Sequence, residues 1–360
     1  MAGRIVVDDR GNCFYACYVG ASVYTRWLVR KSSDEGRTWV DADSFGAGAG
    51  RWNYPTSLAA TPEGDLFVSG ATEDAGGVFA QVRKSTDHGA TWTTSARYQM
   101  PGSAGCKTYN VKCFGGGLVF SMGRCADGVL HWLIRRSADG GVTWADADYP
   151  HAKQAYASKV FDIARAPNGD LVAFGYLDSA AKESWLFRKS SDDGRTWTDL
   201  GGYHTQDGFT DVVGGLMATT SGALLAAGWT IDPKGPIRAL LRRSTDSGAT
   251  WLTVDDYQLD ARKTLYQGLA EDSRGRLFAL ATQVRAEGAG DGASRGMIRV
   301  SSDVGVTWRD YLELRARDGV DATYTSLFID ASDQLLVSGR HGDFAVVQRL
   351  RLASPRPRAR

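Results

Sequence analysis

The sequence predicts an all-β chain made from one structural unit that is copied several times. The tract S-x-D-x-G-x-T-W occurs six times, and its tryptophans follow one another at steps of 53, 52, 53, 54 and 57 residues. A nearly constant period of this length is the signature of a repeat architecture. The composition agrees, because 43 Gly, 9 Pro, 11 Trp, 14 Tyr and 13 Phe are typical of many short strands joined by tight turns.

One copy of the unit, residues 54–99, contains four predicted strands. The segments are YPTSLAAT (54–61), LFVSG (66–70), VFAQVRKS (78–85) and WTTSARYQ (92–99). The intervening PEGD and TDHGAT combine Pro, Asp and Gly in the manner of tight turns. Four antiparallel strands in about 53 residues form one blade of a β-propeller.

The number of copies predicts seven blades. The first three strand patterns recur seven times, whereas the fourth recurs only six times. The copies of the first strand run from GRIVVDD at the start to YTSLFID, which ends at Asp330. We therefore expect the last blade to lack its outer strand or to borrow one, and six blades with an irregular remnant is the alternative. Residues 1–351 are expected to form a single propeller domain, and the basic, proline-containing residues 352–360 a disordered tail.

The tract itself is expected to hold the turn between the third and fourth strands. Its Asp side chain accepts hydrogen bonds from the turn backbone, and its Gly takes a positive φ. Its Trp packs between blades and stabilises by roughly 3 kcal/mol or more. An Arg two residues before each tract is expected to stack on an aromatic ring of a neighbouring blade. These structural residues are Asp34, Asp87, Asp139, Asp192, Asp246, Asp303, Trp39, Trp92, Trp144, Trp197, Trp251 and Trp308.

Charge and composition narrow the range of partners. With 42 basic and 41 acidic side chains the formal charge is +1, which gives no long-range attraction to nucleic acid or to an anionic membrane. No apolar run approaches the roughly 20 residues of a membrane span. No motif indicates a metal or cofactor, so we expect neither, and we expect a monomer.

Cysteine usage and the N-terminus bear on the compartment. The five cysteines are an odd number and lie within the first 125 residues, which favours buried thiols, although a Cys106–Cys125 or Cys106–Cys113 bridge stays open. The N-terminus lacks the features of a secretory signal. As written, the chain is expected to be cytoplasmic, or secreted or periplasmic if it was cut from a longer parent.

Ligand candidates lie in the loops on the face opposite the tracts. Acids follow the second strand of four blades, at Asp74, Asp127, Asp178 and Asp232; they are interpreted as turn-forming residues, with a ring of carboxylates facing a sugar, amine or cation as the alternative. The loop GAGAGRWNY places Arg51, Trp52 and Tyr54 on the same rim. These aromatics anchor the loop or form a platform on which a sugar stacks.

The six tracts match the Asp-box, or BNR repeat, and the chain resembles the sialidase-like propeller superfamily. That resemblance implies the fold and places the Asp-boxes away from the ligand site. It also implies that a sialidase would have three arginines around a carboxylate, a Tyr–Glu nucleophile pair and an early Asp acid. The nearest match to the first arginine motif is Gly3-Arg4-Ile5-Val6, without the family's proline.

The register of the first strands disfavours sialidase activity. Aligned on their turns, these strands place Arg4 level with Ser57, Asn110, Asp162, Gly215, Gly268 and Ser326, which is one arginine rather than three. A glycosidase of ordinary type needs two carboxylates. Asp162, Asp178, Asp211 and Asp232 are candidates for such a pair, and Arg4, Asp162 and Asp178 are the candidate catalytic residues.

Three functions are compatible with this sequence. The first is a non-catalytic propeller that recognises a glycan or a protein on the face opposite the tracts. The second is an exo-sialidase-like glycoside hydrolase or a polysaccharide-degrading enzyme of the same superfamily, and the third is a scaffold. The recurrence of acids after the second strands favours the binding protein.

Overall fold

The structure is a computed structural model that describes residues 4–20, 25–46, 51–149, 157–179, 182–205, 210–231, 235–259, 263–284, 295–315, 322–341 and 344–351. Within these ranges the chain forms β-strands and turns without a helix. Accordingly, the described part of the chain offers no apolar helix of membrane-spanning length. The predicted tail, 352–360, lies outside these ranges.

Strands that are consecutive in the sequence pair antiparallel into sheets, which we number 1 to 7 in chain order. Sheets 1 to 3 comprise β1 (Arg4–Val7), β2 (Cys13–Val19), β3 (Arg26–Ser32) and β4 (Val40–Phe45); β5 (Asn53–Ala60), β6 (Leu66–Asp74), β7 (Gly77–Ser85) and β8 (Thr93–Tyr98); and β9 (Gly105–Cys113), β10 (Val119–Ala126), β11 (Leu130–Ser137) and β12 (Ala145–Asp148). One parallel bridge, Val78 to Gly105, joins sheets 2 and 3.

The remaining strands repeat this arrangement. Sheets 4 and 5 comprise β13 (Ala157–Arg165), β14 (Leu171–Ser179), β15 (Lys182–Ser190) and β16 (Thr198–Tyr203); and β17 (Thr210–Ala218), β18 (Leu224–Ile231), β19 (Ile237–Ser244) and β20 (Leu252–Tyr257). Sheet 6 comprises β21 (Lys263–Glu271), β22 (Leu277–Val284), β23 (Arg295–Ser301) and β24 (Arg309–Arg315). Sheet 7 has three described strands, β25 (Ala322–Ile329), β26 (Gln334–His341) and β27 (Phe344–Arg351).

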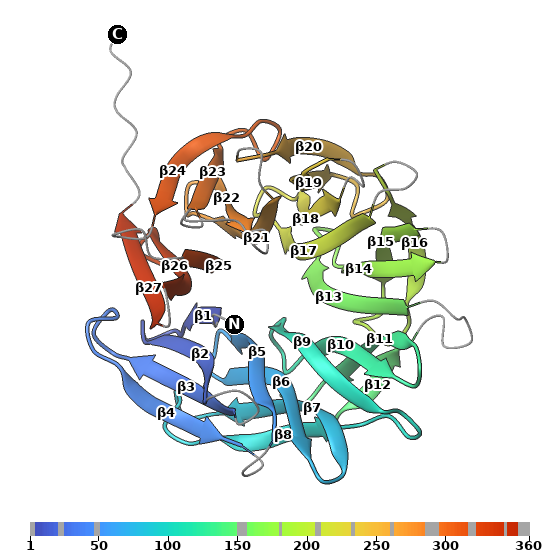
Figure 1. Ribbon diagram of the computed structural model, residues 1–360, viewed down its shortest axis with the longest axis vertical. Coiled ribbons are helices and arrows are strands. Elements are labelled where there is room, and N and C mark those ends of the chain that lie inside the picture. Colours follow the sequence, from blue (N-terminus) through green and yellow to red (C-terminus); the bar gives the residue numbers. More distant parts are fainter. Residues whose placement is uncertain are drawn as a thin grey trace.

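The sheets follow one another around a common centre, and the first strand of each lies nearest that centre (Figure 1). The last sheet lies against the first, because β1 contacts β25 and β26. Ile5 and Tyr15 of sheet 1 share a buried cluster with Leu336 of sheet 7. The all-β class and the antiparallel four-stranded sheets are therefore as predicted.

Each tract forms the same hydrogen-bonded turn. In the fourth copy the Ser190 hydroxyl donates to Asp192 at 2.7 Å and accepts from the Gly194 amide at 2.8 Å. Asp192 also accepts from the Thr196 amide and hydroxyl at 2.9 and 2.7 Å. The Ser–Asp–Thr contacts recur in the other five copies. The Asp therefore holds its own turn, as the sequence predicted.

The tracts also join neighbouring sheets. Their glycines have φ between +80° and +89°, and each tract Trp packs on a buried cluster that contains residues of the preceding sheet. Trp197 is buried, and the other five tryptophans are half-buried. The expected position of these indoles between sheets is confirmed.

Arginines on the third strands add a second junction. Arg188 in β15 donates to both carboxylate oxygens of Asp148 in β12, at 2.8 and 3.0 Å. Arg83 binds Asp43 in the same way and lies 4.4 Å from the Phe45 ring of the preceding sheet. The expected aromatic stacking is present here, and the carboxylate partner is an addition that the sequence reading missed.

A further regularity lies on the innermost strands. In sheets 2 to 7 the first strand carries a β-bulge, so that one residue lies opposite no partner on the second strand. The bulged residues are Thr56, Tyr109, Phe161, Gly214, Gln267 and Thr325. A bulge turns a side chain away from the sheet's alternation. These positions directly precede the residues that the sequence alignment put level with Arg4.

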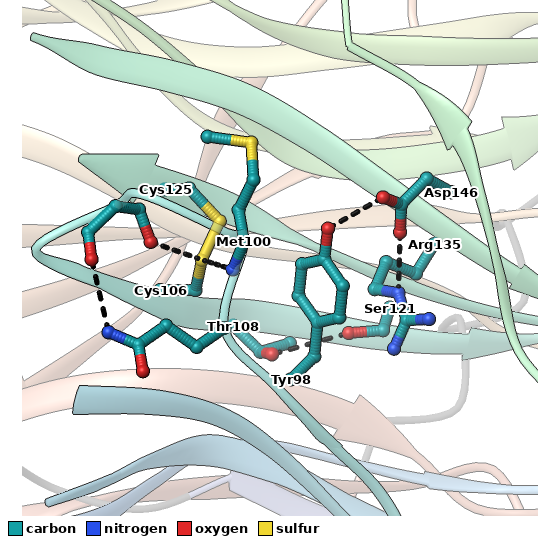
Figure 2. The surroundings of a disulfide bond; sticks show 10 residues. Tyr98, Met100, Cys106, Thr108, Ser121, Cys125, Arg135 and Asp146 are labelled. Atoms are coloured by element: carbon teal, nitrogen blue, oxygen red, sulfur yellow. Dashed lines mark hydrogen bonds and ion pairs between the residues drawn. A yellow bond between two sulfur atoms is a disulfide. The ribbon is translucent and has the colours of Figure 1, made fainter. Parts of the chain in front are cut away.

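A disulfide between Cys106 and Cys125 connects facing positions of β9 and β10 (Figure 2). Both cysteines are buried, and the Met100 amide donates to the Cys106 sulfur at 3.2 Å. Cys13, Cys17 and Cys113 are free thiols. Of the two bridges that the sequence left open, the structure contains this one.

Replacing Cys106 and Cys125 together by Ala is expected to lower the free energy of unfolding by about 3 kcal/mol. The bridge spans 19 residues, and a cross-link over a loop of this size restricts the unfolded chain by about that amount. Urea unfolding of the oxidised protein and the double variant measures the difference. Cys113→Ala, which removes a free thiol, is the control, and equal losses in the two variants would contradict the expectation.

Candidate functional site

The first candidate site is a cavity of about 120 Å³ at the centre of the molecule. Its lining includes Arg4, Lys112, Asp162, Gln267 and Ser326. The innermost strands β1, β9, β13, β21 and β25 contribute these residues, which explains why they meet at the centre although they lie far apart in the sequence. The aligned register predicted a central position for Arg4, Asp162 and Ser326, and the cavity brings them together.

Asp162 belongs to a hydrogen-bonded chain that crosses four sheets. The Ser57 hydroxyl donates to Asn110 at 2.5 Å, and the Asn110 amide donates to Asp162 at 3.1 Å. Asp162 also accepts from the Leu216 amide at 3.0 Å. Lys112 completes its surroundings with a 3.2 Å ion pair. These contacts connect sheets 2, 3, 4 and 5, so Asp162 fastens the innermost strands to one another.

Arg4 brings a cation into the same cavity. Burial lowers the pKa of its guanidinium, and the nearby carboxylate of Asp162 opposes that shift. Among the described residues, no hydrogen bond or ion pair holds the Arg4 side chain. The cavity therefore contains the charges of Arg4 and Lys112 against that of Asp162.

The structure does not bring together the two carboxylates proposed as a catalytic pair. Asp162 faces Phe174 on β14, whereas Asp178 lies four residues further along β14, facing Ala157. Four residues of strand span about 13 Å. That separation exceeds the roughly 5–9.5 Å found between glycosidase carboxylates. The side chain of Asp211 and all of Asp232 lie outside the described residues.

The second candidate site begins at the rim that the sequence analysis singled out. Trp52 is half exposed, and the Lys107 ammonium lies 5.7 Å from its ring and 5.6 Å from the ring of Tyr54. Arg51 pairs with Glu73 at 3.6 Å, and Glu73 also accepts from the Trp52 amide at 3.4 Å. The structure thus brings Arg51, Trp52 and Tyr54 together around a lysine from the next sheet.

Alternating aromatic and basic side chains extend this rim across sheets 3 and 4. Tyr109 stacks on Phe161 with ring centroids 5.1 Å apart, and Phe161 stacks on Tyr176 at 6.2 Å. The Arg124 guanidinium lies 5.9 Å from the Tyr109 ring, and the Lys159 ammonium lies 4.8 Å from the Tyr176 ring. We call the whole surface the aromatic–basic platform; it consists of Trp52, Tyr54, Lys107, Tyr109, Arg124, Lys159, Phe161 and Tyr176.

The platform lies at the end of the sheets opposite the tracts. Tyr54, Lys107 and Lys159 are among the first three residues of β5, β9 and β13. The tracts follow the ends of the third strands, and antiparallel pairing places those ends level with the ends of the first strands. This is the face on which the ligand was expected.

Local structure explains how the stacked rings at the middle of the platform are presented. Tyr109 and Phe161 are bulged residues of β9 and β13, so both leave the regular alternation at the same level. Both rings are half-buried, and burial raises the pKa of Tyr109 to about 12 against the opposing effect of Arg124. The Tyr109 hydroxyl is therefore neutral at ordinary pH.

The acids that follow the second strands serve their own hairpins where the structure describes them. Asp74 accepts from the Gly76 amide at 2.7 Å and pairs with Arg97. Asp127 binds His131 at 2.6 Å, and this hydrogen bond lowers the pKa of Asp127. Asp178 is half-buried within the β14–β15 hairpin. The described contacts are those of turn and hairpin residues rather than of a shared ring of carboxylates.

Most of the platform was missed in the sequence, although a signal exists. Lys107 and Lys159 are 52 residues apart, as are Tyr109 and Phe161, so the pattern K-x-aromatic recurs in two successive first strands. The corresponding positions of β17, β21 and β25 hold Val212, Leu265 and Thr323 in place of lysine. A comparison of the charges on the first strands would have shown that β9 and β13 carry lysines that β17, β21 and β25 lack.

The fold is shared with enzymes that act on carbohydrates. No protein-family model and no curated relative matches the sequence. A PL25 ulvan lyase bound to -[GlcA(1-4)Rha3S]- superposes with a TM-score of 0.66 at 12% identity, over 97% of this chain and 93% of the lyase. The Hadza microbial sialidase Hz136 gives 0.53 at 16% identity, over 92% and 74% of the two chains. The GH93 α-L-arabinofuranosidase of Fusarium graminearum with arabinobiose gives 0.52 at 13%, over 83% and 92%. At these identities the similarity shows a propeller fold.

Proposed function

We propose that this protein binds carbohydrate and that the aromatic–basic platform is the binding site. The observation that carries the proposal is the set of aromatic rings from Trp52 to Phe161 on one face of three adjacent sheets, with the ring of Tyr176 buried against Phe161. Aromatic rings combine apolar faces with polar edges, and they suit the apolar faces and hydroxyl rims of sugars. The proposal includes a seven-bladed ring of the sialidase-like type as the support for this face.

The similar structures support the same class of ligand. Those described above are a polysaccharide lyase, a sialidase and an arabinofuranosidase, and two of them have a bound carbohydrate. Because their identity to this chain is low, they support a carbohydrate-related propeller without assigning a substrate. The platform residues supply the chain's own reason for the proposal.

Replacing Trp52 by Ala is expected to weaken glycan binding about tenfold or more. Trp52 is the most exposed ring of the platform, at 50% of its surface, so its loss removes stacking area without opening the core. A glycan array identifies the ligand, and titration calorimetry with the best ligand compares the variants. Leu252→Ala, at a 71% exposed apolar residue of β20, is the control. An unchanged affinity in the Trp52 variant would refute the platform as the site.

Glycoside cleavage at the central cavity is the second candidate function. The meeting of Arg4, Lys112 and Asp162 in one cavity favours it. The three contacts that Asp162 makes with other sheets, to Asn110, Leu216 and Lys112, disfavour a proton-donating role for this residue. A panel of chromogenic glycosides, tested with the native protein and Asp162→Asn, separates the two functions: binding without turnover leaves the platform as the functional site.

A further inference from the structure

We infer that the carbohydrate is a polyanion, a uronate or sulfated oligosaccharide, and that Lys107 and Arg124 determine this specificity. The inference rests on the proposed function and specifies its ligand. It is based on the basic side chains that alternate with the rings of the platform. Stacking of a neutral glycan on the rings would not require these charges.

Lys107 and Arg124 occupy facing positions of β9 and β10. Both are partly exposed, and neither has a carboxylate partner among the residues that the structure describes. Elsewhere in the described chain basic side chains are often paired, as Arg83 is with Asp43 and Arg188 with Asp148. Two adjacent cations that have no counter-ion among the described residues, on a face that carries aromatic rings, attract an anionic ligand.

The rings fix where these cations act. The Lys107 ammonium lies between Trp52 and Tyr54, and Arg124 lies over Tyr109. The cation–π contacts keep both long side chains close to the stacking surface. A sugar stacked on one of these rings therefore has a positive charge beside its substituents. Arg in this position favours carboxylate or sulfate, whose oxygens accept its forked donors.

The carboxylate of Glu73, which lies on the same rim, already has partners of its own. Glu73 is held by Arg51 and by the Trp52 amide, so its charge is already compensated at the rim. Lys159 brings a further basic residue close to Tyr176 at the other end of the platform.

The extent of the platform indicates a chain of sugars. Its rings come from β5 and the residue that precedes it, and from β9, β13 and β14, which belong to three neighbouring sheets. One group of contacts joins Lys107 to Tyr54, and a second joins Tyr109 to Phe161. The facing positions of Lys107 and Arg124 connect the two groups. One monosaccharide covers one ring, so a surface of this length suits an oligosaccharide with several charged units.

The test compares a neutral glycan with its sulfated form and adds a uronate as a second charged glycan. Binding of the full chain to dextran, dextran sulfate and oligogalacturonate is measured by calorimetry at 50 and 300 mM salt, with poly-L-glutamate as a non-carbohydrate polyanion. We expect binding of oligogalacturonate or dextran sulfate at least tenfold tighter than that of dextran, weakened by salt. Lys107→Gln and Arg124→Gln should each lose about tenfold in affinity for the charged glycan only.

Controls separate failure of the inference from failure of the proposed function. Arg37→Gln removes one charge on the tract face, where the side chain is 78% exposed, and should leave binding unchanged. Circular dichroism and the thermal midpoint check that each variant is folded. Trp52-dependent binding of neutral glycans with no effect of Lys107→Gln would overturn the inference and preserve the proposed function. Equal binding of poly-L-glutamate, independent of Trp52, would overturn both.

Discussion

Replacing Gly194 by alanine is expected to lower the free energy of unfolding by about 4 kcal/mol. A Cβ atom at this position would lie 2.5 Å from both Cε1 and Cζ of Phe120, a fully buried ring of the preceding sheet. Overpacking of a core typically costs about 1–3 kcal/mol. Gly194 also has φ +81°, a conformation that costs a residue with a Cβ a further 1–2 kcal/mol or so.

Gly169 provides a matched control within the same sheet. It has φ +91°, and a Cβ added there meets nothing within 4 Å. Gly169→Ala therefore carries the backbone cost without the clash, and should lose only about 1–2 kcal/mol. Urea unfolding of both variants measures the difference. Similar losses in the two would show that Phe120 can move aside and that the tract glycine is required for its backbone alone.

Replacing Asp148 by alanine is expected to cost about 3–5 kcal/mol, because it leaves Arg188 buried beside an empty site. Both side chains are less than a tenth exposed, and the two are joined by paired hydrogen bonds of 2.8 and 3.0 Å between sheets 3 and 4. Removing one partner of a buried ion pair typically has an effect of this size. Burial raises the pKa of Asp148, which the hydrogen bonds from Arg188 oppose.

Two further variants give this prediction its contrast. Asp41→Ala breaks an exposed pair with Arg30 at 3.1 Å and should cost less than about 1 kcal/mol. Combining Asp148→Ala with Arg188→Met removes the stranded charge, and should recover much of the loss. Chemical denaturation of the four proteins decides the matter. An Asp148 variant as stable as the Asp41 variant would show that Asp199, the other partner of Arg188, suffices alone.

The fold could be predicted well from the sequence because each unit carries a short, recognisable turn motif. The turn chemistry of Asp192 and Gly194 lies within one octapeptide, and its hydrogen bonds are local enough to be inferred from residue type. Counting the same pattern predicted three strands of sheet 7 that the structure describes, β25 to β27. Even the central position of Arg4 and Asp162 followed from aligning first strands on their turns.

The candidate site was harder to predict because it depends on contacts between units. Trp52 was identified as a rim residue, but its contact with Lys107 requires knowing how sheet 2 faces sheet 3. The bulges that present Tyr109 and Phe161 have no residue signature of their own. The sequence analysis offered Asp162 and Asp178 as candidate catalytic carboxylates. The strand register places Asp178 four residues along β14 from the residue that faces Asp162.

The structure describes three strands in the last sheet, so the joint between sheets 7 and 1 has no described outer strand on the side of sheet 7. Arg30 is the counterpart of Arg188, and its described carboxylate partner is Asp41 of its own sheet, as Asp146 is for Arg135. Sheets 1 and 7 are held together there by the apolar packing of β1 and by an ion pair of 3.2 Å between Arg349 and Glu35. Heat or mechanical tension should separate sheets 1 and 7 before any other pair of sheets. Amide hydrogen exchange should then rise in β1 and β27 before it rises in other strands.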